Sequence, residues 1–198
     1  MNIRSVTGFL SLADPLDDAP IRALGDLVRA ARDEFARARF PVQTARLATQ
    51  PFPEIAPTDL KQFARDLEAA CKANGIDYAA LGAVRADHRL APLDVIDDIP
   101  GALIATENIF ASAQIASHEA GINLGAILAT ARVMRALADA IPAGFGNFRF
   151  AALANCPPHS PFFPVAYHHG NAPAFALAVE GAPLAVEASA IQFSISRH

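Results

Sequence analysis

The chain has 198 residues, enough for one domain with a sizeable hydrophobic core. Its 16 basic and 20 acidic residues give a net charge of −4, and the lack of basic tracts and of tryptophan argues against nucleic acid as a partner. No apolar run can span a bilayer, no signal peptide is visible and two cysteines cannot make a disulfide framework, so we expect a cytoplasmic protein without membrane contact.

Strand and helix patterns alternate from the first residues onward. Residues 3–12 and 42–48 alternate as strands, and the segment between them carries an apolar stripe at helical spacing. Asp14-Pro15 predicts where this helix begins, and Pro41 predicts where it ends.

A second cycle follows. Thr58 is the expected cap of the next helix, and Asn74-Gly75 is a helix-stop signal. Residues 76–84 and 102–106 then predict the third and fourth strands.

The longest helix is expected to begin after Asn123 and to end before Pro142. Its core-facing positions are predicted to be Leu124, Ile127, Leu128, Ala131 and Met134. Residues 148–153 and 175–179 predict the last two strands. Strands that alternate with helices favour parallel pairing, so we expect a single α/β domain over residues 1–198, either an open doubly wound sheet or an incomplete barrel.

Polar residues follow the predicted strands, and ligands of parallel α/β proteins collect at that edge. The residues in these positions are Thr49, Gln50, Arg85, Thr106, Glu107, Asn108, Asn155 and Glu180. Arg85 can pair with an anion, Glu107 can move a proton, and Asn155 can fix hydrogen bonds. The alternative is that these residues only cap strands and helices.

Arg149 stands between Phe148 and Phe150, so in a strand it projects from the opposite face. In a sheet covered on both faces it would be a buried cation, for which Glu107 is the expected partner. On an edge strand it would face water instead.

The loop after residue 154 concentrates proline, phenylalanine and histidine. His168 is suited to act as a general base or hydrogen-bond donor. A metal set would need His159, His168 or His169, and Glu180, but this spacing matches no recognised zinc pattern, so no metal site is expected. Glycine-rich nucleotide fingerprints are also missing, so the sequence leaves the cofactor unassigned.

The two cysteines differ in setting. Cys71 lies on an apolar helical stripe and is expected to be a small buried side chain. Cys156 precedes two prolines in the loop, and a nucleophilic thiol there would need His159 or His168 as its base.

Several segments resemble a widespread bacterial and archaeal family known as a conserved domain of unknown function. They are residues 3–7, 75–78, 81–82, 121–124, 147–150 and 161–168. The most specific is Pro161-Phe162-Phe163-Pro164. The resemblance implies a fold similar to pyruvate formate-lyase and other glycyl radical enzymes, a ten-stranded α/β barrel made of two parallel halves.

The chain departs from that family in two ways. Members are typically more than twice its length, so it resembles the N-terminal half of the barrel, as a truncated or split version. It also shows no glycine-radical motif and no adjacent cysteine pair, which argues against radical chemistry. Because a half barrel leaves strand edges unpaired, we expect a homo-oligomer or a second chain that completes the barrel.

These observations lead to three hypotheses about function. The first is a non-radical cytoplasmic enzyme for a small polar or anionic metabolite, with Glu107, Arg149, Asn155 and His168 lining the site. The second is a ligand-binding or regulatory protein without catalysis, and the third is a truncated, inactive product.

Overall fold

The computed structural model describes residues 2–88, 90–182 and 185–186, and within them the chain forms an α/β fold with a seven-stranded sheet. The strands are β1 (Ile3–Leu10), β2 (Val42–Pro51), β3 (Tyr78–Gly82), β4 (Ile109–Ser117), β5 (Gly121–Ile122), β6 (Phe150–Ala154) and β7 (Ala174–Val179). The helices are α1 (Ala19–Arg37), α2 (Phe52–Ile55), α3 (Leu60–Ala73), α4 (Ile99–Ile104) and α5 (Leu124–Ala140), with 3₁₀ helices η1 (Asp94–Asp98) and η2 (Pro142–Arg149).

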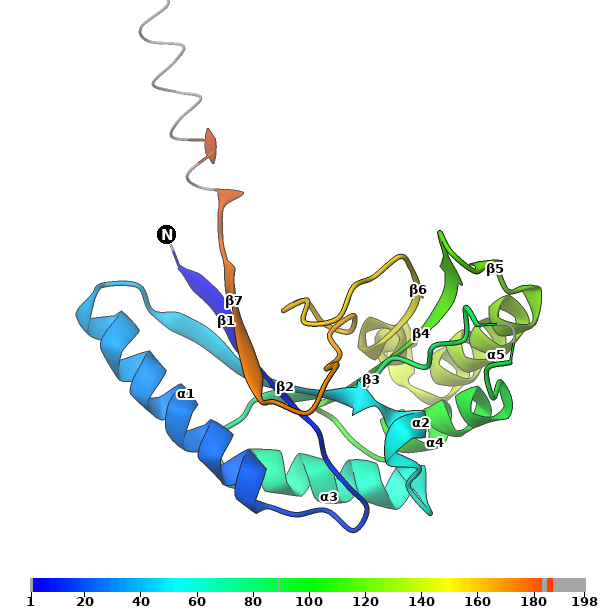
Figure 1. Cartoon of the computed structure of the whole chain (residues 1–198), viewed down its shortest axis with the longest axis horizontal. Helices are drawn as coiled ribbons and strands as arrows, with labels where there is room; N and C mark the ends of the chain where they lie inside the picture. Colours follow the sequence, from blue (N-terminus) through cyan, green and yellow to red (C-terminus); the bar gives the residue numbers. More distant parts are fainter. Residues whose placement is uncertain (1, 89, 183–184, 187–198) are drawn as a thin grey trace, which may run out of the picture.

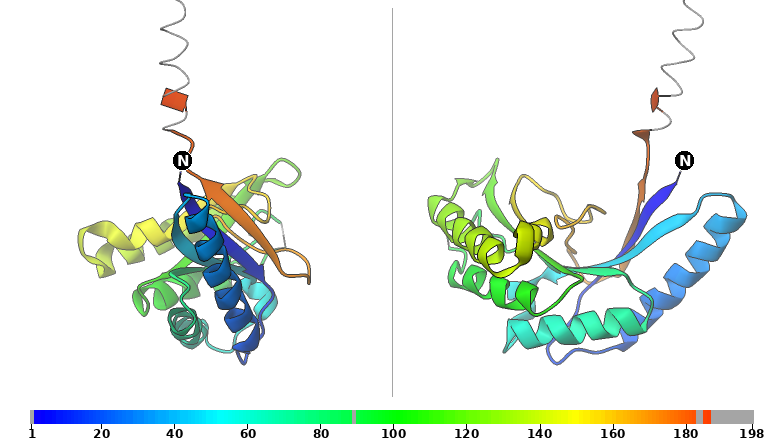
Figure 2. Two further views of the ribbon diagram at one scale, coloured as in Figure 1. Left: turned by 90° about the vertical axis from the view of Figure 1, so that its left-hand side faces the viewer. Right: turned by 180° about the vertical axis from the view of Figure 1, so that it is seen from behind.

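The sheet is mixed, largely parallel and not closed. Strands β1, β2, β3, β4 and β6 are neighbours in chain order and run parallel. Short β5 pairs with the end of β4, and β7 pairs antiparallel with β1. Helices α1, α3, α4 and α5 lie along the convex side of the curved sheet (Figure 1). The two further views show the same arrangement (Figure 2).

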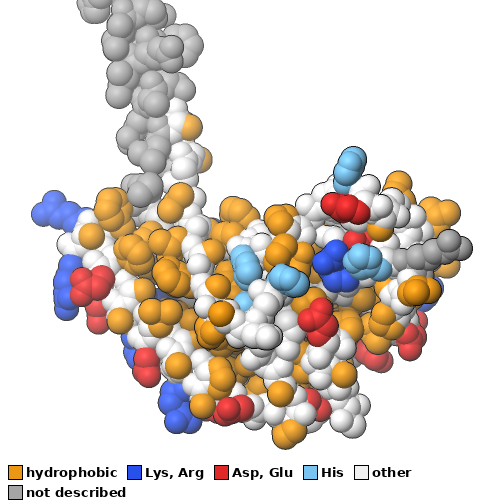
Figure 3. Space-filling view, in the orientation of Figure 1, with side chains coloured by type: hydrophobic (Ala, Val, Ile, Leu, Met, Phe, Trp, Pro, Cys, Tyr) orange, Lys and Arg blue, Asp and Glu red, His pale blue; other side chains and the backbone are white. Residues whose placement is uncertain are grey.

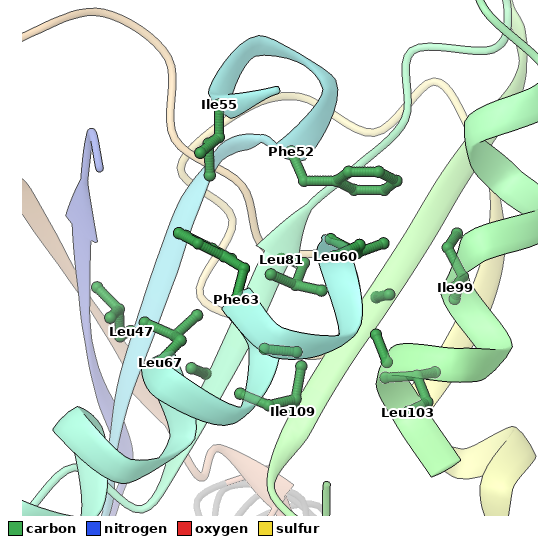
Figure 4. Packing of buried hydrophobic residues seen from close by; sticks show 14 of the residues in the cluster. Leu47, Phe52, Ile55, Leu60, Phe63, Leu67, Leu81, Ile99, Leu103 and Ile109 are labelled. Atoms are coloured by element: carbon green, nitrogen blue, oxygen red, sulfur yellow. The ribbon is translucent and has the colours of Figure 1, made fainter. Parts of the chain in front are cut away.

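The main core lies between this convex side and the helices. Alternate strand residues point to it, because neighbouring side chains of a strand face opposite sides of the sheet. Figure 4 shows the packing of strand residues Leu47, Leu81 and Ile109 against Phe63 and Leu67 of α3 and Ile99 and Leu103 of α4. Each such fully buried side chain contributes roughly 1.5–3 kcal/mol relative to an exposed one.

The concave side of the sheet is covered by the segment between β6 and β7, residues 155–173 (Figure 1). Ala166 and Phe163 of this segment pack against Phe9, Ala48 and Ala80 of the strands. Phe163 also meets Phe110 of β4 edge to face, with ring centroids 5.3 Å apart. Both faces of the central strands are therefore covered, although only one of them by helices.

The expected fourth strand is wrong. Residues 102–104 form the end of helix α4 and not a strand. The fourth strand is β4, at Ile109–Ser117, which the sequence pattern does not reveal. Alanine is the reason, because Ala111, Ala113 and Ala116 weaken the apolar alternation of β4. A short apolar run such as 102–106 fits a buried helix as well as a strand.

The last two strands also differ from expectation. Phe148 and Arg149 end η2, and β6 begins only at Phe150. Strand β7 was expected to be parallel, but it is antiparallel and starts where β1 ends, with Ala174 opposite Phe9. A parallel strand would need a crossover that returns the chain to the amino edge, usually a helix. Residues 155–173 contain no helix, so β7 starts at the carboxyl edge and runs antiparallel to β1.

The cap of α5 is confirmed, because the Asn123 side chain accepts a hydrogen bond from Ala126 N. Its buried stripe is different from the prediction and consists of Ala126, Ala129, Thr130, Val133 and Leu137. Leu124 and Leu128, expected in the core, are 76% and 62% exposed. Small side chains thus form the contact face. At α3 the cap is Asp59, which accepts from Gln62 N, and not Thr58.

Candidate functional site

The structure does not bring the predicted site residues to one place. Glu107 precedes β4 and Arg149 precedes β6, so both lie at the amino edge of the parallel strands. Asn155 follows β6, and the His168 backbone N–H bonds to Thr49 O near the end of β2. Asn155 and His168 therefore belong to the opposite, carboxyl edge.

At the amino edge, Arg149 holds the start of β4. Its Nη1 donates to Thr106 O at 2.8 Å and to Ile109 O at 3.4 Å. Burial lowers the pKa of the guanidinium, and the charges of Glu68 and Glu107 oppose that shift. These bonds to backbone carbonyls indicate that Arg149 stabilises a turn.

Glu107 forms no buried ion pair with Arg149 in the described part of the chain. Its side chain is 85% exposed, and its carboxylate lies 3.8 Å from Lys72 Nζ. Glu68 is more closely engaged, because Oε1 accepts the N–H groups of Glu107 and Asn108. Burial acts to raise the pKa of Glu68, but these hydrogen bonds and Lys72 lower it overall.

Asn155 ties two strand ends together at the carboxyl edge. Its Oδ1 accepts from His118 N at 2.6 Å, and its own N–H donates to Ala116 O. The residue has φ +55°, a left-handed conformation in which asparagine is enriched. Asn155 thus shapes the turn from β6 into the covering segment.

His168 lies fully buried at this same edge and contacts a second histidine. Its Nδ1 is 3.1 Å from Nε2 of His159, and that Nε2 also lies 3.3 Å from the donating N–H of His169. A nitrogen that accepts from a backbone N–H carries a lone pair. His159 Nε2 can accept from His168 only in the tautomer that carries the His168 proton on Nδ1, and in that tautomer Nε2 of His168 has the lone pair.

This Nε2 of His168 is buried and has no hydrogen-bond partner in the described part of the protein. Burial lowers the pKa of His168, and the nearby His159 and His169 lower it further, against a hydrogen bond with the Gly170 backbone. The imidazole is consequently neutral near pH 7. A neutral imidazole with a free lone pair can accept a proton.

The ring of Phe9 in β1 packs against both histidines. Its ring centroid is 5.2 Å from that of His159, edge to face, and 6.5 Å from that of His168. His159 has φ +62°, so the covering segment is strained where it presents this side chain.

A second polar group stands beyond the end of β3. Arg85 Nε lies 3.3 Å from Oδ1 of Asp87, whose carboxylate is fully buried. Gln114 Nε2 donates to Asp87 Oδ2, and Gln114 Oε1 accepts from Cys156 N. Burial acts to raise the pKa of Asp87, but the hydrogen bonds from Arg85, Gln114 and Ser117 lower it overall.

Tyr167 connects this network to the histidines. Its hydroxyl donates to Cys156 O at 3.0 Å, and its carbonyl accepts from His159 N. Burial raises the pKa of Tyr167, the charges of Asp87 and Cys156 add to that shift, and Arg85 opposes it. The facing surface shows histidine side chains at its centre, with basic and acidic side chains beside them (Figure 3).

The sequence reading missed Asp87 and Gln114. Asp87 lies two residues beyond Arg85, which was predicted to end a strand, so proximity in sequence could have indicated it. Gln114 belongs to β4, the strand that the pattern did not reveal.

The positions of the two cysteines and of Glu180 support neither a thiol site nor the metal site considered above. Burial raises the pKa of Cys71 to about 12, consistent with an inert core thiol. Cys156 Sγ contacts Ala154 O at 3.6 Å and bonds to neither histidine. Glu180 accepts a hydrogen bond from Asn2 at the amino edge, where β7 ends beside the start of β1. His159 lies at the opposite, carboxyl edge. Within the described ranges, no three His, Cys, Asp or Glu side chains form a metal site.

Among the described residues, no helix is both long and apolar enough to cross a bilayer.

Comparison with known proteins gives a consistent result. Residues 1–192 match the family described as "Uncharacterised ACR (DUF711)". A UPF0210 protein of Pelotomaculum thermopropionicum is 29% identical over 192 residues, which cover 85% of this chain and 41% of that protein. A UPF0210 protein of the archaeon Methanopyrus kandleri is 28% identical over 194 residues, covering 85% and 42%.

The chain spans about two fifths of the length of these curated relatives. Since the family match extends over nearly all of its residues, the chain belongs to the DUF711/UPF0210 family of uncharacterised bacterial and archaeal proteins.

Proposed function

We propose that the carboxyl edge around His168 binds a small anionic metabolite and that His168 is the general base of a non-radical enzyme. The observation that carries this proposal is the buried Nε2 of His168, which has no partner among the described residues. With the His168 proton on Nδ1, facing His159, this nitrogen carries a lone pair. A buried polar atom left unpaired costs roughly 1–3 kcal/mol, so a ligand that donates to it would recover that cost. His159 acts as a positioning residue, because its Nε2 fixes the tautomer of His168.

Arg85 is the proposed anion contact. Asp87 holds its guanidinium beyond the end of β3, and Gln114 in turn donates to Asp87. The Arg85 side chain remains 37% exposed, so it can still donate to a carboxylate or phosphate. When His168 accepts a proton from the ligand, the electron pair stays on the ligand, and Arg85 would offset the developing negative charge. Asn155 would shape the loop, whereas Glu107 and Arg149 would act only at the amino edge.

A second candidate is a ligand-binding or regulatory protein without catalysis. The complete burial of His168 favours it, because a ligand reaches Nε2 only if the covering segment moves. In this case the same compounds would bind and would not be converted.

We also propose that the open sheet corresponds to one half of a ten-stranded barrel of the glycyl-radical-enzyme type. The support is the curved run of five parallel strands in chain order with helices on one side. The longer relatives would complete that barrel within one chain.

The test is a thermal-shift screen of the chain with small carboxylates and inorganic phosphate, followed by NMR detection of product from every stabilising compound. Arg85→Gln is expected to weaken binding at least about tenfold through loss of a charge-assisted pair. His168→Gln should retain much of the binding and lose conversion. His118→Gln, an exposed histidine, is the matched control and should behave as the unmodified protein.

Conversion lost only in His168→Gln supports the enzyme, and stabilisation without conversion supports the binding protein. The proposed site is incorrect if no anion stabilises the chain, or if Arg85→Gln and His168→Gln bind and convert as the unmodified protein does.

A further inference from the structure

Strand β7 lies at one border of the described sheet. It pairs antiparallel with β1, and the described part of the chain places no strand on its other side (Figure 1). Such an edge presents a row of backbone N–H and C=O groups that can pair with another chain.

The side chains of β7 do not protect this edge. Alternate residues of β7 point to one face of the sheet. On this face Phe175, Leu177 and Val179 are 61%, 38% and 55% exposed. No residue from Ala174 to Val179 is charged or proline, which are the usual devices that prevent edge pairing.

The apolar surface continues from β7 onto α1. Leu27 is 46% exposed, and a hollow of about 230 Å³ lies between the strand and the helix. It is lined by Leu10, Pro20, Ala23, Leu24, Leu27, Pro173, Ala174 and Phe175. The outer edge of β7 and this hollow together form the β7 surface.

We propose that the β7 surface binds a second copy of this chain, with the two β7 strands antiparallel about a two-fold axis at Leu177. Residues directly opposite each other in an antiparallel pair share one face of the sheet. An axis at Leu177 satisfies this rule, because it sets Phe175 against the partner's Val179 and Leu177 against the partner's Leu177.

A second copy suits this edge because the strand is complementary to itself. The pairing joins an aromatic with a β-branched residue twice, a favourable combination in sheets. The alanines on the other face oppose each other as well, Ala176 with the partner's Ala178. The first charge beyond the strand, Glu180, hydrogen-bonds Asn2 and would lie opposite the partner's Ala174, so like charges do not meet.

The axis is perpendicular to the sheet, so both copies would keep α1 on the same side of one continuous sheet. The hollows of the two copies would then border the same apolar strip. This inference concerns the edge of the sheet and does not depend on the proposed function at the carboxyl edge.

Sedimentation equilibrium over a micromolar concentration range tests the dimer. The unmodified chain is expected to dimerise, and Leu177→Lys should raise the dissociation constant at least about tenfold, because two ammonium groups would oppose each other at the axis. Leu128→Lys is the matched control on the exposed face of α5 and should leave the dimer intact. Circular dichroism melts verify that both variants fold.

Disulfide cross-linking between the two copies supplies a second measurement, which introduces no charge into β7. Opposed residues in antiparallel strands have Cα atoms about 4.5–5.5 Å apart, within the disulfide range of about 4.4–6.8 Å. Oxidised Leu177→Cys should therefore give a covalent dimer and Leu128→Cys should not. A monomer at all concentrations, an unaffected Leu177→Lys dimer, or an edge that pairs only with a different protein overturns the inference.

Discussion

At the scale of single residues, the surroundings of His168 determine its chemistry. The side chain has no contact with water, and its Nδ1 faces Nε2 of His159. Protonation would place a charge in this setting without a partner for the second nitrogen, so the neutral form is favoured. The same balance links the protonation of His168 to the stability of the fold.

The stability of the protein should decrease as the pH falls below 6.5, the ordinary pKa of a histidine. The pKa of His168 is lower in the folded chain, so the unfolded chain binds more protons in this window and the free energy of unfolding declines with decreasing pH. The contribution of one such group is at most about 1.4 kcal/mol per pH unit. Urea denaturation between pH 7.5 and 5.5 measures it.

His168→Gln should reduce this pH dependence, because the replacement does not titrate. His169→Gln is the matched control, since His169 is exposed in the same segment. Equal slopes for the unmodified protein and His168→Gln would contradict the assignment.

At the scale of elements, local hydrogen bonds decide where helices begin. Asn123 is recognisable as the cap of α5 because it directly precedes an apolar helical run, and its Nδ2 additionally donates to Ala86 O. At α3, two adjacent residues are both suitable caps. The structure selects Asp59, whose Oδ1 lies 3.0 Å from Gln62 N, whereas Thr58 N donates to Asp14 Oδ2.

Asp59→Ala should destabilise the protein by about 1 kcal/mol, the typical cost of a lost N-cap. Thr58→Ala is the matched neighbour and should cost less than about 0.5 kcal/mol, because its hydroxyl is not the cap. Thermal denaturation monitored by circular dichroism at pH 7 compares the two. A larger loss for Thr58→Ala would show that the helix begins one residue earlier.

At the scale of the whole molecule, residues 155–173 replace a layer of helices on the concave side of the sheet. Phe163 anchors this segment, because its ring meets Phe110 and the Arg46 guanidinium stands 5.2 Å from its centroid. Burial lowers the pKa of Arg46, with the charge of Arg4 adding to the shift, although Tyr78 and Asp77 oppose it. The neighbouring Phe162 is 60% exposed.

Phe163→Ala should lower the free energy of unfolding by about 2–3 kcal/mol, somewhat less than a fully buried phenylalanine, because the ring is only partly buried. It should also loosen the histidine pair and increase proteolysis within residues 155–173. Phe162→Ala is the control and should change stability by less than about 0.5 kcal/mol. Chemical denaturation measures the stability, and limited chymotrypsin digestion measures the proteolysis, because both variants keep Tyr167 as a cleavage site within the segment. Equal losses for the two variants would mean that the segment is not anchored at Phe163.

The sequence by itself determined the α/β class, the parallel pairing of the early strands, the cap of α5 and the family resemblance. These follow from local periodicity, capping chemistry and short motifs, which depend on neighbours along the chain. Alanine-rich β4 and the contact face of α5 were missed, because small side chains weaken the apolar contrast on which periodicity depends.

Only the tertiary structure decided which edge of the sheet each polar residue occupies. Glu107 and Arg149 lie at the amino edge because β4 begins after Glu107 and β6 begins after Arg149, and β7 is antiparallel because no helix precedes it. The Asp87–Gln114 bond likewise joins residues far apart in sequence, and the His159–His168 pair forms where their segment packs on Phe9 of β1. Register and long-range contacts set these positions, and no local pattern encodes them.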